Sequence, residues 1–172
     1  RKGIGVTLIE KLLGRLPEVN LLNVQYRMNE YIMAFSNKVF YNGQLQAAPE
    51  VKAQRIDADA DHPLIFIDTA GCGFDEKMHP KYKSRYNPEE FLILREHLYQ
   101  LKDAFHPEAL PSVAIISPYR EQVVHMEQMI EEDPALENLA LTINTIDGFQ
   151  GQERDVVYIS LVRSNAKGEI GF

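Results

Sequence analysis

The sequence predicts an α/β protein with a mostly parallel sheet and helices on both faces. Segments whose apolar residues recur at the 3- and 4-residue steps of a helix alternate along the chain with short, almost wholly apolar runs. Such alternation is typical of parallel strands that are joined by crossover helices. In sheets of this kind, ligands bind beyond the carboxyl ends of the strands.

The first half of the chain contains two helical patterns. Ile9, Leu12, Leu13 and Leu16 stand at helical spacing, and a second pattern ends at Tyr41-Asn42-Gly43. In chain order we expect a helix over residues 9–16, an extended segment at 21–24, a helix over 29–40 with Ile32, Phe35, Val39 and Phe40 on one side, a surface connection over 44–62, a strand at 64–68 and an irregular loop over 69–86.

The second half contains the best-marked helix. Asn87-Pro88-Glu89-Glu90 supplies an N-cap, a proline at the first helical position and a glutamate at the third. In chain order we expect this helix over residues 88–105, a buried strand at 113–116, a helix capped by Ser117-Pro118 with Val123, Met126 and Ile130 inward, an extended segment at 140–144, a polar loop over 145–155 and a strand at 156–163. Because the last run is apolar at nearly every position, we expect it to be buried on both faces.

The length of 172 residues fits one domain over residues 1–172. The composition, 45% hydrophobic and 25% charged, is that of a soluble globular chain, and no apolar run approaches the roughly 20 residues of a membrane span. No signal peptide follows Arg1, so we expect no membrane partner and an intracellular location, cytoplasmic or nuclear. The single cysteine, Cys72, excludes an internal disulfide and a cysteine cluster for zinc, so we expect no metal site.

The charge balance restricts how the chain can meet nucleic acid. Eighteen Lys and Arg against 25 Asp and Glu give a formal net charge of -7, so contact with a polyanion must come from a local patch. Basic and aromatic residues alternate in one stretch, which contains Lys77, His79, Lys81, Tyr82, Lys83, Arg85 and Tyr86. This composition suits a surface that stacks on bases and follows phosphates. A solvated loop explains it as well.

A polar loop precedes the last strand. It carries Asp147, Gln150, Glu153 and Arg154 around two glycines, which places directional polar groups beside a backbone that is free to approach a ligand. This pattern favours a site for a sugar, a phosphate or a backbone amide. The alternative is a polar turn that Asp147 caps.

Three segments together resemble successive motifs of a known family. They are Val24-Gln25-Tyr26-Arg27-Met28, Ile116-Ser117-Pro118-Tyr119-Arg120-Glu121-Gln122, and Asp147 to Asp155 followed by Val162-Arg163-Ser164-Asn165. In this order they are similar to the second RecA-like domain of superfamily 1 helicases. The similarity is to the 5′-to-3′ branch, which includes the nonsense-mediated-decay helicase and, nearer, the immunoglobulin mu-switch-binding helicase. It implies a three-layer RecA-like domain of the P-loop NTPase type.

The resemblance implies a role in ATP hydrolysis for one arginine. In the family, the residue that matches Arg27 reaches the γ-phosphate of ATP held by the first RecA-like domain, where a planar cation stabilises the shifting charge. Glu153 matches a glutamate that binds the ribose. The implied ATP-binding residues are Gln25, Tyr26, Arg27, Gln150, Gly151 and Glu153. The alternative is that Arg27 pairs with an acid and Tyr26 only packs.

The resemblance also implies a surface for single-stranded nucleic acid. Hydroxyl groups, a helix N-terminus and a cation can bind a phosphodiester backbone. The implied residues are Ser117, Pro118, Tyr119, Arg120 and Thr145. A plain helix cap explains Ser117-Pro118 equally well.

The chain departs from the family chiefly in what it lacks. It has no Gly-x-x-x-x-Gly-Lys-Ser/Thr phosphate loop and no Asp-Glu pair for Mg²⁺, which belong to the first RecA-like domain, and it stops before the final motif. Asn29-Glu30 stands where many relatives carry His-Pro. We therefore expect a fragment that is inactive alone, whose parent is an ATP-dependent DNA or RNA helicase that uses ATP and Mg²⁺. A non-catalytic nucleic-acid-binding or protein-binding adaptor is the alternative, and a small-molecule enzyme lacks a compact set of catalytic groups.

Overall fold

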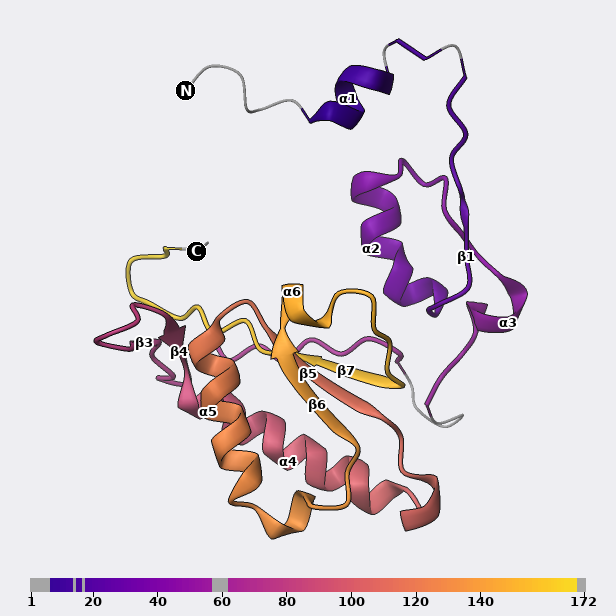
Figure 1. Ribbon diagram of the computed structural model, residues 1–172. Coiled ribbons are helices and arrows are strands. Elements are labelled where there is room, and N and C mark those ends of the chain that lie inside the picture. Colours follow the sequence, from indigo (N-terminus) through magenta and orange to yellow (C-terminus); the bar gives the residue numbers. More distant parts are fainter. Residues whose placement is uncertain (1–6, 14, 17, 57–61, 170–172) are drawn as a thin grey trace. The chain divides into compact units, whose positions relative to one another are not determined.

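Strand β5 (Val113–Ser117) is the central strand of a three-stranded parallel sheet in the computed structural model (Figure 1). Strand β6 (Leu141–Thr145) pairs with it on one side and β7 (Val156–Ile159) on the other. Four of the five residues of β5 are buried, as its run of β-branched residues predicts. The structure describes residues 7–13, 15–16, 18–56 and 62–169. The predicted α/β class with a mostly parallel sheet is confirmed.

The chain divides into two compact units. The first is Arg1–Arg55 with Asp61–Leu64, and the second is Ile56–Ala60 with Ile65–Phe172. The three-stranded sheet and its helices α4 and α5 belong to the second unit, whereas α1, α2 and α3 belong to the first. One domain over residues 1–172 stays a prediction.

Helix α4 (Pro88–Ala104) begins as the sequence predicts. The Asn87 side chain accepts a hydrogen bond from the Glu90 backbone N–H, and Pro88 occupies the first turn, where its missing N–H costs nothing. Helix α5 (Arg120–Glu131) begins later than predicted. Its N-cap is Tyr119, which makes no side-chain capping bond, so Ser117-Pro118 forms the turn before the helix and not its cap.

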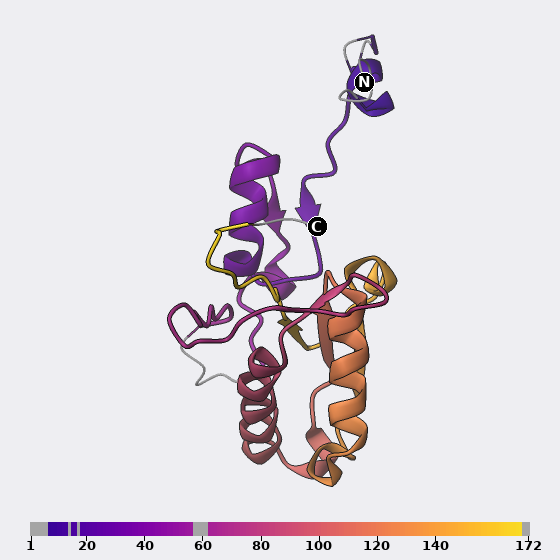
Figure 2. The ribbon, with the colours of Figure 1, turned by 90° about the vertical axis from the view of Figure 1, so that its left-hand side faces the viewer.

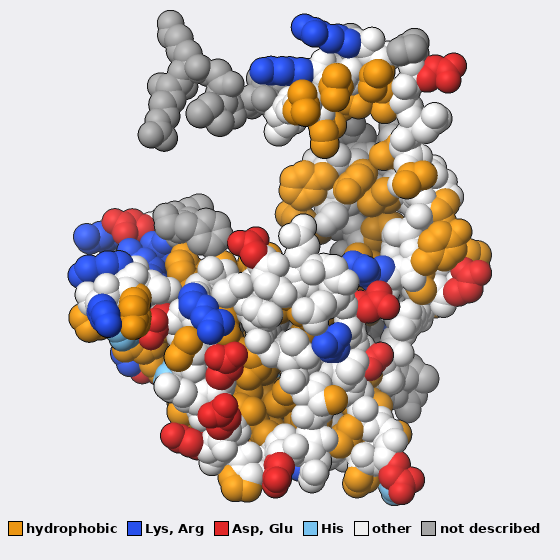
Figure 3. All heavy atoms as spheres, in the orientation of Figure 1, with side chains coloured by type: hydrophobic (Ala, Val, Ile, Leu, Met, Phe, Trp, Pro, Cys, Tyr) orange, Lys and Arg blue, Asp and Glu red, His pale blue; other side chains and the backbone are white. Residues whose placement is uncertain are grey.

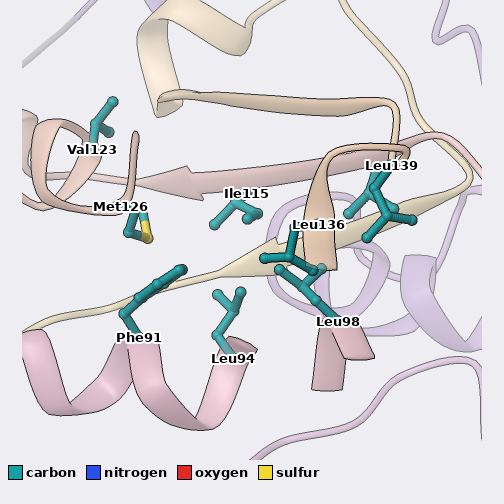
Figure 4. Packing of buried hydrophobic residues seen from close by; sticks show 9 residues of the cluster. Phe91, Leu94, Leu98, Ile115, Val123, Met126, Leu136 and Leu139 are labelled. Atoms are coloured by element: carbon teal, nitrogen blue, oxygen red, sulfur yellow. The ribbon is translucent and has the colours of Figure 1, made fainter. Parts of the chain in front are cut away.

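One hydrophobic core joins α4 and α5 to the sheet. The two helices lie side by side (Figure 2) and contact the face of β5 that carries Val113 and Ile115, because alternate residues of a strand share a face. Around Ile115 the side chains of Phe91, Leu94 and Met126 converge (Figure 4). The buried cluster consists of Phe91, Leu94, Leu98, Val113, Ile115, Val123, Met126, Leu136 and Leu139. Each fully buried member contributes about 1.5–3 kcal/mol relative to an exposed side chain.

Strand β7 differs from its prediction. Within the described sheet it pairs with β5 alone, so it is an edge strand. Val156 and Tyr158 pack against the core, whereas Val157 and Ile159 on the other face are 43% and 57% exposed. The expectation of burial on both faces is therefore wrong. A run of apolar residues shows that a strand is possible, but its position in the sheet depends on its neighbours.

The strand predicted at residues 64–68 is absent from the described structure. This segment has no strand partner, and Ile65 and Phe66 are 70% and 78% exposed. The region predicted as an irregular loop, in turn, contains a hairpin of β3 (Lys77–Met78) and β4 (Arg85–Tyr86), which pair antiparallel. Its alternation of polar and aromatic residues is too short to signal a hairpin from sequence.

The first unit contains the shorter elements. They are α1 (Leu8–Leu13), β1 (Val24–Gln25), α2 (Glu30–Phe40), β2 (Gln46–Ala47) and α3 (Pro49–Lys52), and β1 pairs parallel with β2. Asn29 caps α2 by accepting from the Tyr31 N–H at 2.8 Å. The predicted apolar side of this helix is exposed in the structure, since Phe35 and Phe40 are 68% and 70% exposed and Met33 alone of the helix is buried.

Short helical turns complete the fold. They are the 3₁₀ turns η1 (Pro107–Ala109) and η2 (Pro134–Leu136) and the four-residue helix α6 (Ile146–Phe149), which lies in the stretch predicted as a polar loop. In the described part of the chain, no helix has both the length and the apolar content that crossing a membrane requires.

Candidate nucleotide and nucleic-acid site

Two of the predicted motifs meet at the carboxyl edge of the sheet. Ser117 and Thr145 are register partners at the last positions of β5 and β6. The turn that leads into α5 and the turn that leads into α6 therefore leave the sheet side by side. This is the edge at which ligands of parallel sheets bind.

The side chains at the end of β5 mostly serve the turn itself. Ser117 is fully buried, and its Oγ accepts a hydrogen bond from the Tyr119 N–H at 3.3 Å. Tyr119 is 8% exposed. Both side chains are thus buried in this structure, and their contact with nucleic acid stays a prediction. Arg120 is exposed and Pro118 is half-buried, so these two can present themselves to a ligand.

Thr145 has a defined structural role in addition to its position. Its Oγ1 accepts a hydrogen bond from the Gly148 N–H at 3.2 Å and so caps α6. Thr145, and not Asp147, thus provides the cap of this turn. The ligand-binding role of the loop stays a prediction. Gly148 is confined, because a Cβ on it would lie 2.2 Å from Oδ1 of Asn144.

The loop after α6 is braced by Arg154. This guanidinium donates to Thr142 Oγ1 through Nε at 3.3 Å and Nη2 at 2.9 Å, and to the Glu153 carbonyl at 2.6 Å. Arg154 therefore holds the loop to β6. Gln150, Gly151 and Glu153 are exposed, and Gly151 takes a φ of 86°, which favours glycine.

Asp155 fixes the start of β7. Its carboxylate accepts from the Ser112 N–H at 2.8 Å and Oγ at 2.6 Å, and its own N–H donates to Ser112 Oγ. Because the Ser112 hydroxyl and N–H bind the charged form, they hold the pKa of Asp155 below its usual value, against the smaller effect of burial. This reciprocal contact joins the residues that directly precede β5 and β7.

A buried polar network that sequence reasoning missed supports the end of β7 and the start of α4. The Gln122 side chain is fully buried in α5 and binds the backbone of Asn87 and the hydroxyl of Ser160. The Glu90 carboxylate accepts from the Leu161 and Val162 N–H groups at 3.0 and 2.8 Å. The available signal was a glutamine at an inward helical position beside Val123.

Val162 is held in an unfavourable backbone conformation. Its φ is 71°, a region that costs a β-branched residue about 1–3 kcal/mol. The two bonds from Glu90 and burial of the Val162 side chain to 2% exposure offset this cost. The turn that carries Arg163, Ser164 and Asn165 away from the sheet thus has one defined geometry.

Glu76 is the ionic centre of that turn, and sequence reasoning missed it as well. Its carboxylate pairs with Arg85 Nη1 at 2.5 Å and Arg163 Nε at 2.8 Å, and it accepts from the Ser164 N–H at 3.0 Å. Burial raises the pKa of Glu76, but hydrogen bonds from Arg163, Ser164 and Asn165 and the charge of Arg163 outweigh burial and lower it.

In the first unit, Gln25 shapes the turn that presents Arg27. Its Oε1 accepts from the Arg27 N–H at 2.8 Å and the Met28 N–H at 2.9 Å, and its Nε2 donates to the Met28 carbonyl at 2.7 Å. The Gln25 amide is therefore engaged in the turn, whereas Tyr26 is 71% exposed and Arg27 is exposed. Arg27 and Glu153 belong to different units, and their approach to one nucleotide stays a prediction.

Together these features define an α/β domain of the P-loop NTPase type that has no phosphate loop in its own sequence. Within the described residues, no group of three His, Cys, Asp or Glu side chains is arranged to hold a metal ion. A family model described as an AAA domain matches residues 4–172. The chain belongs to this family.

Relatives with known names agree. The chain is 40% identical over 184 residues to the DNA polymerase alpha-associated DNA helicase A of Saccharomyces cerevisiae, with 96% of this chain and 26% of that protein covered. It is 36% identical over 181 residues to the DNA-binding protein SMUBP-2 of Mesocricetus auratus, with 99% and 18% covered. An uncharacterised ATP-dependent helicase of Methanocaldococcus jannaschii is 34% identical over 177 residues, with 94% and 25% covered.

The comparisons confirm the resemblance to superfamily 1 helicases, close to the mu-switch-binding helicase. The chain spans about a quarter or less of the length of these relatives.

Proposed function

We propose that this chain acts as the second motor domain of an ATP-dependent DNA or RNA helicase. It would supply an arginine to the γ-phosphate of ATP, a carboxylate to the ribose and a grip on single-stranded nucleic acid. The observation that supports this most is the register of Ser117 with Thr145, which brings the turns of two motifs to the ligand-binding edge of one sheet.

The ATP side of the proposal uses Arg27, Tyr26 and Glu153. Arg27 stands on a turn that three hydrogen bonds of Gln25 fix, so its backbone does not need to be ordered when the phosphate arrives. Its guanidinium would bind γ-phosphate oxygens as their charge shifts during transfer. The exposed Glu153 would accept hydrogen bonds from ribose hydroxyls, on a loop that Arg154 braces.

ATP and Mg²⁺ fit this chain only as ligands that it shares with another domain. The exposed arginine and carboxylate are suited to the phosphate and sugar, and the sequence has no phosphate loop or Asp-Glu pair for the metal. Mg²⁺, which neutralises phosphate charge, would be held by the first RecA-like domain of the same polypeptide. This chain by itself is then expected not to hydrolyse ATP.

The nucleic-acid side uses Arg120, Pro118 and Thr145. Arg120 is exposed in the first turn of α5, where backbone N–H groups and a guanidinium together suit a phosphate. Ser117 and Tyr119 position this turn from below. Closure of the two motor domains on ATP and reopening after hydrolysis would make the grip alternate between them.

The test is nucleic-acid-stimulated ATP hydrolysis by the full-length parent protein. Arg27→Ala should lower kcat by roughly 100-fold or more, the range expected when a donor that stabilises transition-state charge is removed. Lys38→Ala, on the exposed surface of α2, is the matched control and should keep wild-type turnover. Unchanged kcat in Arg27→Ala would remove this arginine from the mechanism.

Two further measurements separate the roles. Glu153→Gln should raise KM for ATP more than it lowers kcat, because the ribose contact is the same in ground and transition states. Single-strand binding by a wild-type parent that turns over no ATP would instead identify a non-catalytic adaptor.

A further inference from the structure

We infer that the β3–β4 hairpin, residues 77–86, is an additional contact for single-stranded nucleic acid, in which Tyr82 stacks on a base and Lys81 and Lys83 bind phosphates. This inference rests on the proposed function, since it extends the surface proposed at Arg120. None of the motif residues discussed above lies in the hairpin. Its evidence is a ring pair, a rigid backbone, a bond to α5 and a local excess of cations.

The hairpin presents an exposed aromatic platform. The rings of His79 and Tyr82 are stacked, with centroids 4.8 Å apart and an interplanar angle of 19°. Tyr82 is nevertheless 64% exposed, and Nζ of Lys81 lies 5.1 Å from its ring centroid. A tyrosine that is packed for stability alone would be covered, whereas an exposed ring that is held in a fixed orientation suits stacking on a base.

The platform is held by its own backbone. The His79 N–H donates to the Ser84 carbonyl at 2.9 Å, and the Lys83 N–H donates to the His79 carbonyl at 3.0 Å. Nδ1 of His79 accepts from the N–H groups of Lys81 and Tyr82 at 3.3 and 3.2 Å, which fixes the ring on which Tyr82 stacks. A ligand would therefore meet a preformed surface and would not need to order it.

A hydrogen bond ties the hairpin to the proposed nucleic-acid surface. Ser84 Oγ accepts from the Glu121 N–H at 3.2 Å, in the first turn of α5 and next to Arg120. The hairpin and Arg120 thus occupy neighbouring positions in the second unit. A single strand of nucleic acid that binds at Arg120 could therefore continue onto the hairpin.

The cations of the hairpin divide into two groups. Lys77 pairs with Glu89 at 3.0 Å and Arg85 with Glu76, so these two serve the fold. Lys81 and Lys83 are exposed at the tip. Figure 3 shows Lys and Arg side chains gathered on the side of the second unit that carries β3 and β4. An acidic residue of α5, Glu121, also approaches the hairpin, with its Oε1 3.8 Å from Nε2 of His79.

The expected interaction strengths favour stacking of a base on the Tyr82 ring over the present contact of Lys81 with that ring. An exposed cation–π contact changes an equilibrium about 2- to 5-fold, whereas stacking one base on an aromatic ring changes affinity about 5- to 100-fold. A base can therefore displace Lys81 from Tyr82, and the freed ammonium can bind a phosphate. An acidic peptide would use the lysines but gains nothing comparable from the ring.

The experiment measures binding of the full-length parent to two labelled single strands of equal length, oligo-dT and its abasic counterpart, by fluorescence anisotropy. Tyr82→Ala should weaken oligo-dT binding about 5- to 100-fold and leave abasic binding within 2-fold. Tyr82→Phe keeps the ring and should stay close to wild type. Unchanged oligo-dT affinity in Tyr82→Ala, or equal losses on both strands, would overturn the base-stacking role.

The cation role is tested by salt dependence. Lys81→Gln with Lys83→Gln should reduce the slope of log affinity against log salt by about 1.4, since each phosphate contact on a single strand contributes about 0.7. The matched control, Lys11→Gln with Lys38→Gln, removes two exposed cations from the first unit and should keep the slope. An unchanged slope in the hairpin variant would overturn the phosphate contacts.

The outcomes distinguish the hairpin from the helicase proposal. If Arg27→Ala abolishes turnover while all hairpin variants bind as wild type, the hairpin inference fails and the proposed function stands. If the wild-type parent binds no single-stranded nucleic acid, the proposed function fails, and the hairpin inference that rests on it fails as well. Stronger loss of binding to a poly-glutamate peptide than to oligo-dT in the lysine variant would identify an acidic-peptide surface and overturn the inference.

Discussion

The side chain of Gln122 binds both backbone groups of Asn87. Its Oε1 accepts from the Asn87 N–H at 2.8 Å, and its Nε2 donates to the Asn87 carbonyl at 3.1 Å. The same Nε2 donates to Ser160 Oγ at 3.0 Å. One fully buried amide on α5 therefore fixes the residue that begins α4 and the residue that follows β7. This contact joins α5 to the start of α4 and to the end of β7.

Replacing this amide should cost stability out of proportion to its size. Gln122→Leu keeps the volume but leaves the Asn87 N–H and carbonyl buried without partners, and we expect a loss of about 2 kcal/mol in the free energy of unfolding. Gln128→Leu, exposed on the same helix, should change it by less than about 0.5 kcal/mol. Urea unfolding of both variants measures this. Equal effects would show that the amide network contributes nothing.

The ionic centre at Glu76 predicts acid sensitivity. The pKa of Glu76 in the folded protein lies below its ordinary value of 4.5, because hydrogen bonds from Arg163, Ser164 and Asn165 outweigh the opposing effect of burial. A lowered folded pKa gives stability that is present above about pH 4.5 and is lost as pH falls through the folded value. We expect Glu76→Gln to lower the free energy of unfolding by about 2 kcal/mol at pH 7.

The check is urea unfolding from pH 7 to pH 3. Wild type should lose stability steadily below about pH 4.5, and Glu76→Gln should lose less over the same range, because it lacks one group that takes up a proton on unfolding. Asp155 also has a lowered pKa in the folded protein and accounts for part of the remaining slope. Parallel profiles for the two proteins would contradict this role of Glu76.

A side chain at Gly148 should be destabilising while Asn144 is present. An added Cβ would lie 2.2 Å from Oδ1 and 2.7 Å from Cγ of Asn144, and Oδ1 accepts a hydrogen bond from the Thr145 N–H. Gly148→Ala must displace this amide, and we expect a net loss of about 1 kcal/mol, since overpacking exceeds the gain in helix propensity within a four-residue helix.

A double-mutant cycle with Asn144→Ala tests this contact. In that background the clash is gone, so alanine at position 148 should be neutral or slightly stabilising, and the coupling should reach about 1 kcal/mol. Thermal or urea unfolding of the four proteins gives the coupling. Additive effects would mean that the two side chains do not compete for the same space.

The brace from Arg154 to Thr142 predicts local rigidity of the loop that carries Gln150 and Glu153. Thr142→Val removes the hydroxyl that accepts two guanidinium bonds, and should speed amide hydrogen exchange in residues 148–153 about 5- to 10-fold. Thr142→Ser keeps the acceptor and serves as the control. Exchange in β5 should stay unchanged. Acceleration spread evenly over the second unit would indicate general destabilisation instead.

The sequence correctly predicted those elements that depend on residues close to one another in the chain. Asn87-Pro88 begins α4 and Asn29 begins α2 as expected, because a capping side chain acts on backbone a few residues away. The buried character of β5 also follows from its run of apolar residues. The family resemblance, built on three ordered motifs, is confirmed by the comparisons.

The predictions that were wrong, and the residues that were missed, concern features that depend on partners distant in the chain. Residues 64–68 read as a strand, but no neighbouring strand pairs with them in the described structure, and β7 lies at an edge that its composition does not reveal. Gln122 and Glu76 were missed because their importance comes from contacts with Ser160 and Arg163, 38 and 87 residues away. Polar side chains acquire such roles only after packing brings their partners together.

The position of the buried cluster in the chain also affects how the protein folds during its synthesis. All its members lie between Phe91 and Leu139, in α4, β5, α5 and the turn that follows, so each contact closes a comparatively short stretch of chain. Such a region can assemble on the ribosome while β7 is still inside the exit tunnel. We expect the nascent polypeptide to gain protease resistance in two steps, first when Leu139 emerges and again when β7 adds to the preformed layer.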